Sequence, residues 1–401
     1  MPRMGLEVAD VFRRFGPAYR EAQAGHLSLG ELRAMTAIET CRTAELGGHV
    51  EVCADCGLVR NSYNSCRNRH CPKCQAATAR EWLEARQAEL LPVRYFHTVF
   101  TLPEQLGAIA YQNKAVVYSL LFRAAAETLE TIAADPRHLG ARIGFTAVLH
   151  SWGQSLTHHP HLHCVIPGGG ISPDGKWIHC RRNFFLPVRV LSRLFRRLFL
   201  SGLHAAFQAG TLSFFGTQQH LAEPKAFAAH LAPLREREWV VYSKAPFAGP
   251  EQVLAYLSRY THRVAIANSR LLKMTGEGIT FRWKDYRRRA TDRKQVMTLA
   301  PAEFMRRFLL HVLPDRFHRI RYYGLFANGQ RSANFERCRK LLALAVAAHK
   351  TAALTVPPDA PRPPWDPCVC PACGGRMMVT ERIEGLRAAI RGHHPRRLDG
   401  L

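Results

Sequence analysis

The residues best suited to chemistry lie between positions 158 and 163, where four of six residues are histidines. Apolar, β-branched residues follow, and a glycine run ends the segment, which is typical of a short buried strand. Because side chains alternate along a strand, we expect His161 and His163 on one face and Leu162 directed into the core. Two imidazoles one strand period apart can bind the same divalent metal ion.

A metal site on this strand needs at least one more ligand, which the spacing does not identify. The candidates are His150, Gln154, His159 and His262.

Two Cys-x-x-Cys turns lie upstream, Cys53–Cys56 and Cys71–Cys74, separated by fourteen residues. This spacing predicts one tetrahedral Cys₄ zinc site, since each short turn directs two thiolates at one ion. Four further side chains that can bind metal lie nearby: Cys41, His49, Cys66 and His70. They could build a second site, or Cys66 and His70 could enter the first. Arg67 and Arg69 beside them indicate DNA docking, with a solvated basic face as the alternative.

A third cysteine group follows the proline-rich stretch 357–367, which reads as a stiff linker. Cys368, Cys370 and Cys373 make at most half of a zinc ribbon. Only histidines 393 and 394 follow them, so the closing ligands are not evident from the sequence.

Residues 250–263 are expected to form a helix that begins with proline and glutamate. Tyr256 and Tyr260 are four residues apart, so both phenols lie on one helical face, with Arg259 and Arg263 near them. The alternative is a pair of structural tyrosines packed against a sheet.

Hydrophobic periodicity predicts the surrounding elements. Helices are expected over 1–40, 76–91, 104–133, 191–208 and 301–313. Strands are expected over 94–101, 143–150, 264–274 and 279–286, and a hairpin over 177–185. The chain returns from the 143–150 strand directly into the histidine strand, so these two strands should be antiparallel. Arg282 and Lys284 belong to a basic stretch interleaved with aromatic residues, a pattern that suits single-stranded nucleic acid.

The whole chain of 401 residues has 56 Lys+Arg against 31 Asp+Glu, a net charge of +25. Such an excess points to a polyanionic partner, most often nucleic acid. No apolar segment is long enough to span a bilayer and no secretory signal opens the chain, so we expect a soluble, intracellular protein without a membrane partner. Its cysteines should then be reduced, and clustered ones should bind metal.

Together, a metal on a strand, paired tyrosines and a large positive charge predict phosphodiester chemistry. The metal would offset charge on the scissile phosphate, and a tyrosine oxygen would attack phosphorus, giving a covalent phosphotyrosine and a free 3′-OH. A phenol with a pKa near 10 needs help to ionise, which the metal and arginines would provide.

At these residues the sequence resembles the HUH (histidine–hydrophobic–histidine) transposases of bacterial insertion sequences, most closely the two-tyrosine IS ninety-one family. The resemblance covers 49–75, 97–103, 150–170, 256–263 and 281–328. It implies that His161 and His163 bind Mg²⁺ or Mn²⁺ and that Tyr256 and Tyr260 are the nucleophiles. It also implies an α+β fold, a central antiparallel sheet flanked by helices and preceded by a small zinc-binding domain.

The implied activity is rolling-circle-like transposition through single-stranded DNA, with transposon ends and target DNA as partners, in the bacterial cytoplasm at the nucleoid. An oligomer is compatible with the sequence. The expected domains are a helical segment (1–40), a zinc-binding DNA-recognition domain (41–92), a catalytic domain (93–335), a helix (336–356), and a linker with a cysteine-containing basic tail (357–401).

Two other functions compete with this one. A replication initiator or relaxase-type nickase would share the chemistry and differ in biology. A non-catalytic zinc-ribbon DNA-binding protein would explain the charge and the cysteines, but it would leave the histidine cluster and the tyrosine pair as coincidences.

Overall fold

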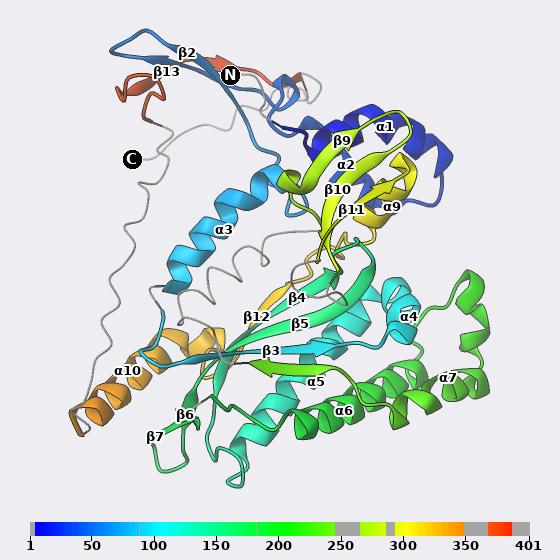
Figure 1. Ribbon diagram of the computed structural model, residues 1–401, viewed down its shortest axis with the longest axis vertical. Coiled ribbons are helices and arrows are strands. Elements are labelled where there is room, and N and C mark those ends of the chain that lie inside the picture. Colours follow the sequence, from blue (N-terminus) through cyan, green and yellow to red (C-terminus); the bar gives the residue numbers. More distant parts are fainter. Residues whose placement is uncertain are drawn as a thin grey trace, which may run out of the picture. The chain divides into compact units, whose positions relative to one another are not determined.

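The computed structural model describes residues 5–87, 89–181, 183–244, 265–285, 293–348 and 368–386. The chain divides into two compact units (Figure 1). The first unit combines Met1–Gln75 with Thr351–Leu401, and the second is Ala76–Lys350. Segments from both ends of the chain therefore build the first unit, and each unit is described by itself.

Helices open the first unit, as the sequence predicts. They are α1 (Val8–Ala22), α2 (Leu29–Thr40) and the 3₁₀ turn η1 (Ala44–Leu46). Ser28 caps α2: its hydroxyl accepts from the Glu31 N–H at 3.2 Å, and the Glu31 carboxylate accepts from the Ser28 N–H at 2.8 Å. The two helices pack through fully buried side chains such as Phe12 and Met35.

A three-stranded antiparallel sheet completes the first unit, in the order β13-β1-β2. Its strands are β1 (Gly48–Cys53), β2 (Val59–Tyr63) and β13 (Met377–Ile383). The C-terminal strand thus pairs with a strand that precedes it by more than 300 residues, in contrast to the separate tail expected from the sequence. Helix α3 (Pro72–Gln87) begins at a proline, which suits a first helical turn.

The second unit is built on a five-stranded sheet in the order β12-β4-β5-β3-β8, in which every neighbouring pair is antiparallel. The strands are β3 (Tyr95–Thr101), β4 (Gly144–Trp152), β5 (His158–Pro167), β8 (Val241–Lys244) and β12 (Ile320–Gly324). The α+β class with an antiparallel sheet flanked by helices is therefore confirmed.

Helices lie along one face of this sheet (Figure 1). They are η2 (Glu104–Leu106), α4 (Gly107–Gln112), α5 (Lys114–Ala134), α6 (Val188–Gln208), η3 (Gly216–Ala222) and α7 (Pro224–Glu236). Phe122, Phe199 and Phe227 from these helices share one hydrophobic core with the sheet residues Phe100 and Leu162.

Smaller elements complete the second unit. They are the paired strands β6 (Gly169–Ile171) and β7 (Trp177–His179), the sheet β9 (Leu271–Met274), β10 (Ile279–Lys284) and β11 (Lys294–Leu299), and the helices η4 (Asn268–Arg270), α9 (Pro301–Leu309), η6 (Asn328–Gln330) and α10 (Arg331–Ala348). The hairpin predicted over 177–185 is wrong, because β7 pairs with the preceding strand β6 and not with a strand that follows it. The strands predicted over 264–274 and 279–286 contain β9 and β10, which pair with each other. Within the described ranges, no helix is both long and apolar enough to cross a bilayer.

Candidate metal centres

Three histidines meet on the sheet face opposite the helices of the second unit. His161 and His163 lie on β5, and His150 lies on β4 directly opposite His161 in the antiparallel register. The ring nitrogens available as ligands lie within 4.8 Å of one another. Leu162, between the two β5 histidines, is fully buried in the helix-covered core. The predicted alternation is therefore confirmed, and β4 supplies the third imidazole.

Hydrogen bonds orient the two imidazoles on β5. Nδ1 of His161 lies 2.7 Å from the His159 carbonyl oxygen, so it carries the proton and donates, and Nε2 keeps its lone pair. Nδ1 of His163 lies 2.7 Å from Nε2 of His97 on β3. A proton on Nδ1 in that hydrogen bond leaves Nε2 of His163 free to bind a cation. Such partners on the far ring nitrogen are common in metal-binding histidines.

Burial keeps these rings neutral. Desolvation lowers the pKa of His161 to about 4 and the pKa of His163 well below its ordinary value. Neutral imidazole is the form that binds metal. Three nitrogen donors suit a transition-metal dication such as Mn²⁺ better than Mg²⁺, which prefers oxygen ligands.

Of the other candidates for the third ligand, His159 does not join the cluster and contributes its backbone carbonyl instead. The role of Gln154 as a ligand stays a prediction. His262 lies outside the described residues, as do Tyr256 and Tyr260 with the neighbouring Arg259 and Arg263. Their roles remain predictions. Of the tyrosines that the structure describes, Tyr242 on β8 lies opposite Val99, the same residue that faces His163, so it shares the histidine face.

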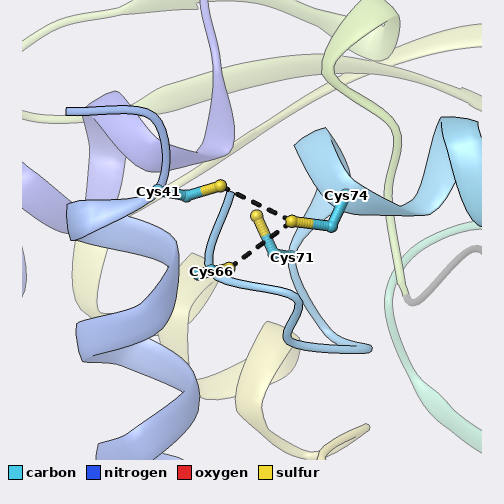
Figure 2. Close-up of side chains that lie close together, drawn as sticks. All are labelled: Cys41, Cys66, Cys71 and Cys74. Carbon is cyan, nitrogen blue, oxygen red and sulfur yellow. Dashed lines mark hydrogen bonds between the residues drawn. The ribbon is translucent and has the colours of Figure 1, made fainter. Parts of the chain in front are cut away.

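Four thiols form a second centre in the first unit: Cys41, Cys66, Cys71 and Cys74 (Figure 2). The Cys74 sulfur lies 3.5 Å from those of Cys41 and Cys66. A tetrahedral zinc ion with Zn–S bonds of about 2.3 Å holds its sulfurs about 3.8 Å apart, so this spacing is that of a structural zinc site. Cys71 and Cys74 are placed by the first turn of α3, where the Cys74 N–H donates to the Cys71 carbonyl.

The thiols of this centre influence one another strongly. Hydrogen bonds from Cys41, Cys66 and Cys71 lower the pKa of Cys74, whereas hydrogen bonding with Cys41, Cys66 and Cys74 raises the pKa of Cys71. Hydrogen bonding with Cys66 and Cys71 also lowers the pKa of Cys41 to about 7, so thiolates are favoured at two of the four positions and opposed at the other two. Four thiolates at this distance require a cation, as a zinc ion would provide.

A third centre joins Cys53 and Cys56 to Cys370 and Cys373. The predicted grouping of Cys53 and Cys56 with Cys71 and Cys74 is therefore wrong. Cys53 and Cys56 lie beside Cys370 and Cys373, whereas Cys71 and Cys74 lie beside Cys41 and Cys66. The reason is topological, because the end of β1 carries the first pair to the C-terminal strand rather than to the start of α3.

The two histidines considered as zinc ligands have other contacts. Nε2 of His49 pairs with the Glu51 carboxylate at 2.8 Å. His70 is buried, and its Nδ1 lies 3.2 Å from the Asn68 side-chain oxygen. Neither belongs to a thiol cluster of the described residues. Cys66 does lie with Cys71 and Cys74, but beside Cys41 and not beside Cys53 and Cys56, so neither of the predicted ligand sets is found.

Basic side chains cover the open face of the sheet β9–β11. Arg282 and Lys284 are exposed on β10, and Lys294 lies directly opposite Lys284 on β11. Lys273 on β9 faces the same side, because it pairs with Thr280 two residues before Arg282. Sequence reasoning missed Lys273 and Lys294, which strand pairing alone brings beside the predicted pair.

Two family models match the chain. One, described as "Transposase zinc-binding domain", matches residues 11–102, and the other, described as "Putative transposase", matches residues 144–334. The "Putative transposase y4qJ" of Sinorhizobium fredii is 59% identical over 394 residues, covering 96% of this chain and 98% of that protein. The "Transposase for insertion sequence element IS801" of Pseudomonas savastanoi pv. phaseolicola is 27% identical over 359 residues, 89% of this chain and 85% of that one.

Among solved structures, a metal-bound conjugative relaxase TrwC in complex with oriT DNA is 14% identical. The match covers 65% of this chain and 96% of the relaxase chain, with a TM-score of 0.26. A score this low supports no conclusion about this chain.

Proposed function

We propose, since this chain belongs to the IS91 family of insertion-sequence transposases, that it cuts and rejoins single-stranded DNA through a covalent tyrosine intermediate. The observation that supports this most directly is the buried cluster of His150, His161 and His163. Three imidazoles converge there on the sheet face opposite helices α5 and α6, and hydrogen bonds orient two of them. A DNA-binding protein without catalysis has no use for such a cluster.

The histidines would hold a divalent cation, Mn²⁺ or Mg²⁺, with the nitrogen donors favouring Mn²⁺. When bound, that cation offsets negative charge on the scissile phosphate. His163 and His161 direct Nε2 toward it because their Nδ1 atoms are engaged by His97 and by the His159 carbonyl.

In the proposed reaction, the phenolate oxygen of Tyr256 or Tyr260 attacks phosphorus. The bond from phosphorus to the 3′ oxygen breaks, the 3′ oxygen takes up a proton, and the 5′ phosphate stays on the tyrosine. Attack by a 3′-OH later reverses the step without ATP, because the phosphotyrosine preserves the bond energy. Two tyrosines would permit two linked cleavages in one site, as rolling-circle-like transposition requires.

The rest of the chain would bind and position the DNA. We assign structural zinc to the cluster of Cys41, Cys66, Cys71 and Cys74 and phosphate contacts to Arg67 and Arg69 near it. Arg282 and Lys284 would contact the strand on the sheet β9–β11, and Arg259 and Arg263 near the tyrosines. The partners are then single-stranded transposon ends and target DNA, in the bacterial cytoplasm at the nucleoid.

The test of the nucleophiles is a covalent-adduct assay with labelled single-stranded DNA from the ends of the element and Mn²⁺. We expect a protein–DNA adduct that survives SDS and is absent from the Tyr256→Phe/Tyr260→Phe double variant. Tyr242→Phe is the matched control, because Tyr242 is half exposed and lies on the same sheet face as the histidines. An adduct that persists in the double variant and disappears in Tyr242→Phe would overturn the assignment of the nucleophiles.

The metal centre is tested separately from the nucleophiles. His161→Ala or His163→Ala should lower the cleavage rate at least a hundredfold, since removing one of three ligands removes the cation. DNA affinity by filter binding should stay within about twofold of wild type, because the basic surfaces are unchanged. Normal cleavage by either variant would refute the metal site.

A further inference from the structure

We propose that Cys53, Cys56, Cys370 and Cys373 bind a second structural zinc ion, which fastens the C-terminal segment to the N-terminal unit. Of the two matched domain models, the zinc-binding one ends at residue 102, so it contains only half of this ligand set. The inference does not depend on the proposed reaction.

The sulfur positions fit one ion. Sγ of Cys53 lies 3.5 Å from Sγ of Cys373, and Sγ of Cys56 lies 3.7 Å from Sγ of Cys370. All four sulfurs lie within 4.8 Å of one another. These distances approach the edge of about 3.8 Å in a tetrahedral zinc–thiolate site. All four cysteines are free thiols.

The two turns that carry these cysteines have the same backbone geometry. In the first, the Gly57 N–H donates to the Cys53 carbonyl at 3.1 Å, and in the second the Gly374 N–H donates to the Cys370 carbonyl at 3.0 Å. Both glycines have positive φ, 70° and 80°, a conformation that other residues rarely adopt. Each turn therefore presents two thiols in the same way, as in a zinc ribbon made of two matching halves.

Strand pairing holds the halves together. β1 leads into the first turn and β13 leaves the second, and the two strands pair from Gly48 with Ile383 to Cys53 with Met377. Cys53, Cys370 and Met377 form a small buried cluster at the site. Unlike a cysteine group on a loose tail, the C-terminal pair is thus built into a folded sheet.

A metal at this position has a mechanical consequence. It joins segments more than 300 residues apart, so its binding free energy contributes to retaining the C-terminal strand in the first unit. The ion would then act together with strand pairing to hold residues 368–386 in place.

The first experiment is a count of zinc per chain by mass spectrometry of the full-length protein. Cys53→Ser/Cys56→Ser and Cys370→Ser/Cys373→Ser should each lose one equivalent relative to wild type. The quadruple variant should also lose one, because both pairs hold the same ion. Cys368→Ser, in the same segment but outside the cluster, is the matched control and should lose none.

A loss of two equivalents in the quadruple variant would show separate ions and overturn the shared site. No loss in Cys370→Ser/Cys373→Ser would do the same. Cobalt substitution gives a further readout: wild type should show thiolate-to-cobalt charge transfer from eight sulfurs, and Cys370→Ser/Cys373→Ser from four.

The second experiment needs no cysteine substitution, so it is informative even where the variants fold poorly. A specific protease site is inserted in the linker between residues 357 and 367, and the cleaved protein is passed over a sizing column. The C-terminal fragment should co-elute with the body while zinc is bound and separate after chelation. Release with zinc still bound, or retention after zinc loss is verified, would each overturn the fastening role.

Discussion

His97 is a residue whose role the sequence does not reveal. It lies on β3 and its ring stacks on His163, with centroids 4.9 Å apart and ring planes only 6° apart. Nε2 of His97 lies 2.7 Å from Nδ1 of His163. Burial lowers the pKa of His97 to about 4, so it is neutral and can accept a hydrogen bond at Nε2. We therefore regard His97 as a positioning residue that orients a metal ligand.

Replacing His97 tests that role. His97→Phe keeps a stacked ring but removes the acceptor, so Mn²⁺ affinity should fall about 10- to 100-fold. Saturating Mn²⁺ should restore most of the cleavage rate, and His97→Gln, whose amide oxygen can accept, should keep most of the affinity. Mn²⁺ titration of cleavage measures both, with the exposed His220→Gln as control. Equal Mn²⁺ affinity in wild type and His97→Phe would contradict the assignment.

The sheet β9–β11 carries its basic residues on one face. β10 alternates between buried Ile279 and Phe281 and exposed Arg282 and Lys284. Lys284 lies directly opposite Lys294, an arrangement of like charges that destabilises a sheet. A polyanion bound across this face would relieve the repulsion, which favours the face as a DNA-binding surface.

The salt dependence of DNA binding measures that contact. For single strands, log K falls with log salt by about 0.7 per phosphate contact, so Arg282→Ala should reduce the slope by about that amount. Lys284→Ala should act similarly. Arg235→Ala, exposed on α7, is the control and should leave the slope unchanged. An unchanged slope in Arg282→Ala, or an equal change in Arg235→Ala, would rule out this surface.

At the scale of elements, the sequence predicted the strands whose formation depends on residues that are close together in the chain. The alternation around His161 identified β5, and the strands predicted over 264–274 and 279–286 contain β9 and β10. The cysteine pairing could not be read in the same way, because any two Cys-x-x-Cys turns can share a metal. One clue was present: a glycine follows Cys56 and Cys373, whereas Cys74 is followed by glutamine in a helix. The pairing of the cysteines depends on the register of β1 against β13, which come from opposite ends of the chain. In the same way, the contact between His150 and His161 depends on the register of β4 against β5 across a loop.

At the scale of the molecule, the two units differ in what stabilises them. The second unit buries a large core of aromatic and aliphatic side chains between its sheet and helices. The first unit is smaller, and it contains two clusters of free thiols. Small units that bury little apolar surface often depend on metal for folding. The stability of the first unit should therefore depend on zinc, and that of the second should not.

Hydrogen exchange after chelation separates the two cases. Once zinc is removed, amides of β1, β2 and β13 should lose at least tenfold in protection, because closely spaced thiolates without a cation repel one another. Amides of β3, β4 and β5 should keep theirs, since Leu162 and its neighbours are buried by apolar contacts alone. Zinc added back should restore the first group, which controls for irreversible damage. Protection that persists in β1 after verified zinc loss would show that strand pairing suffices. A parallel loss in β5 would show that the units unfold as one, and either result would remove the basis for treating zinc as specific to the first unit.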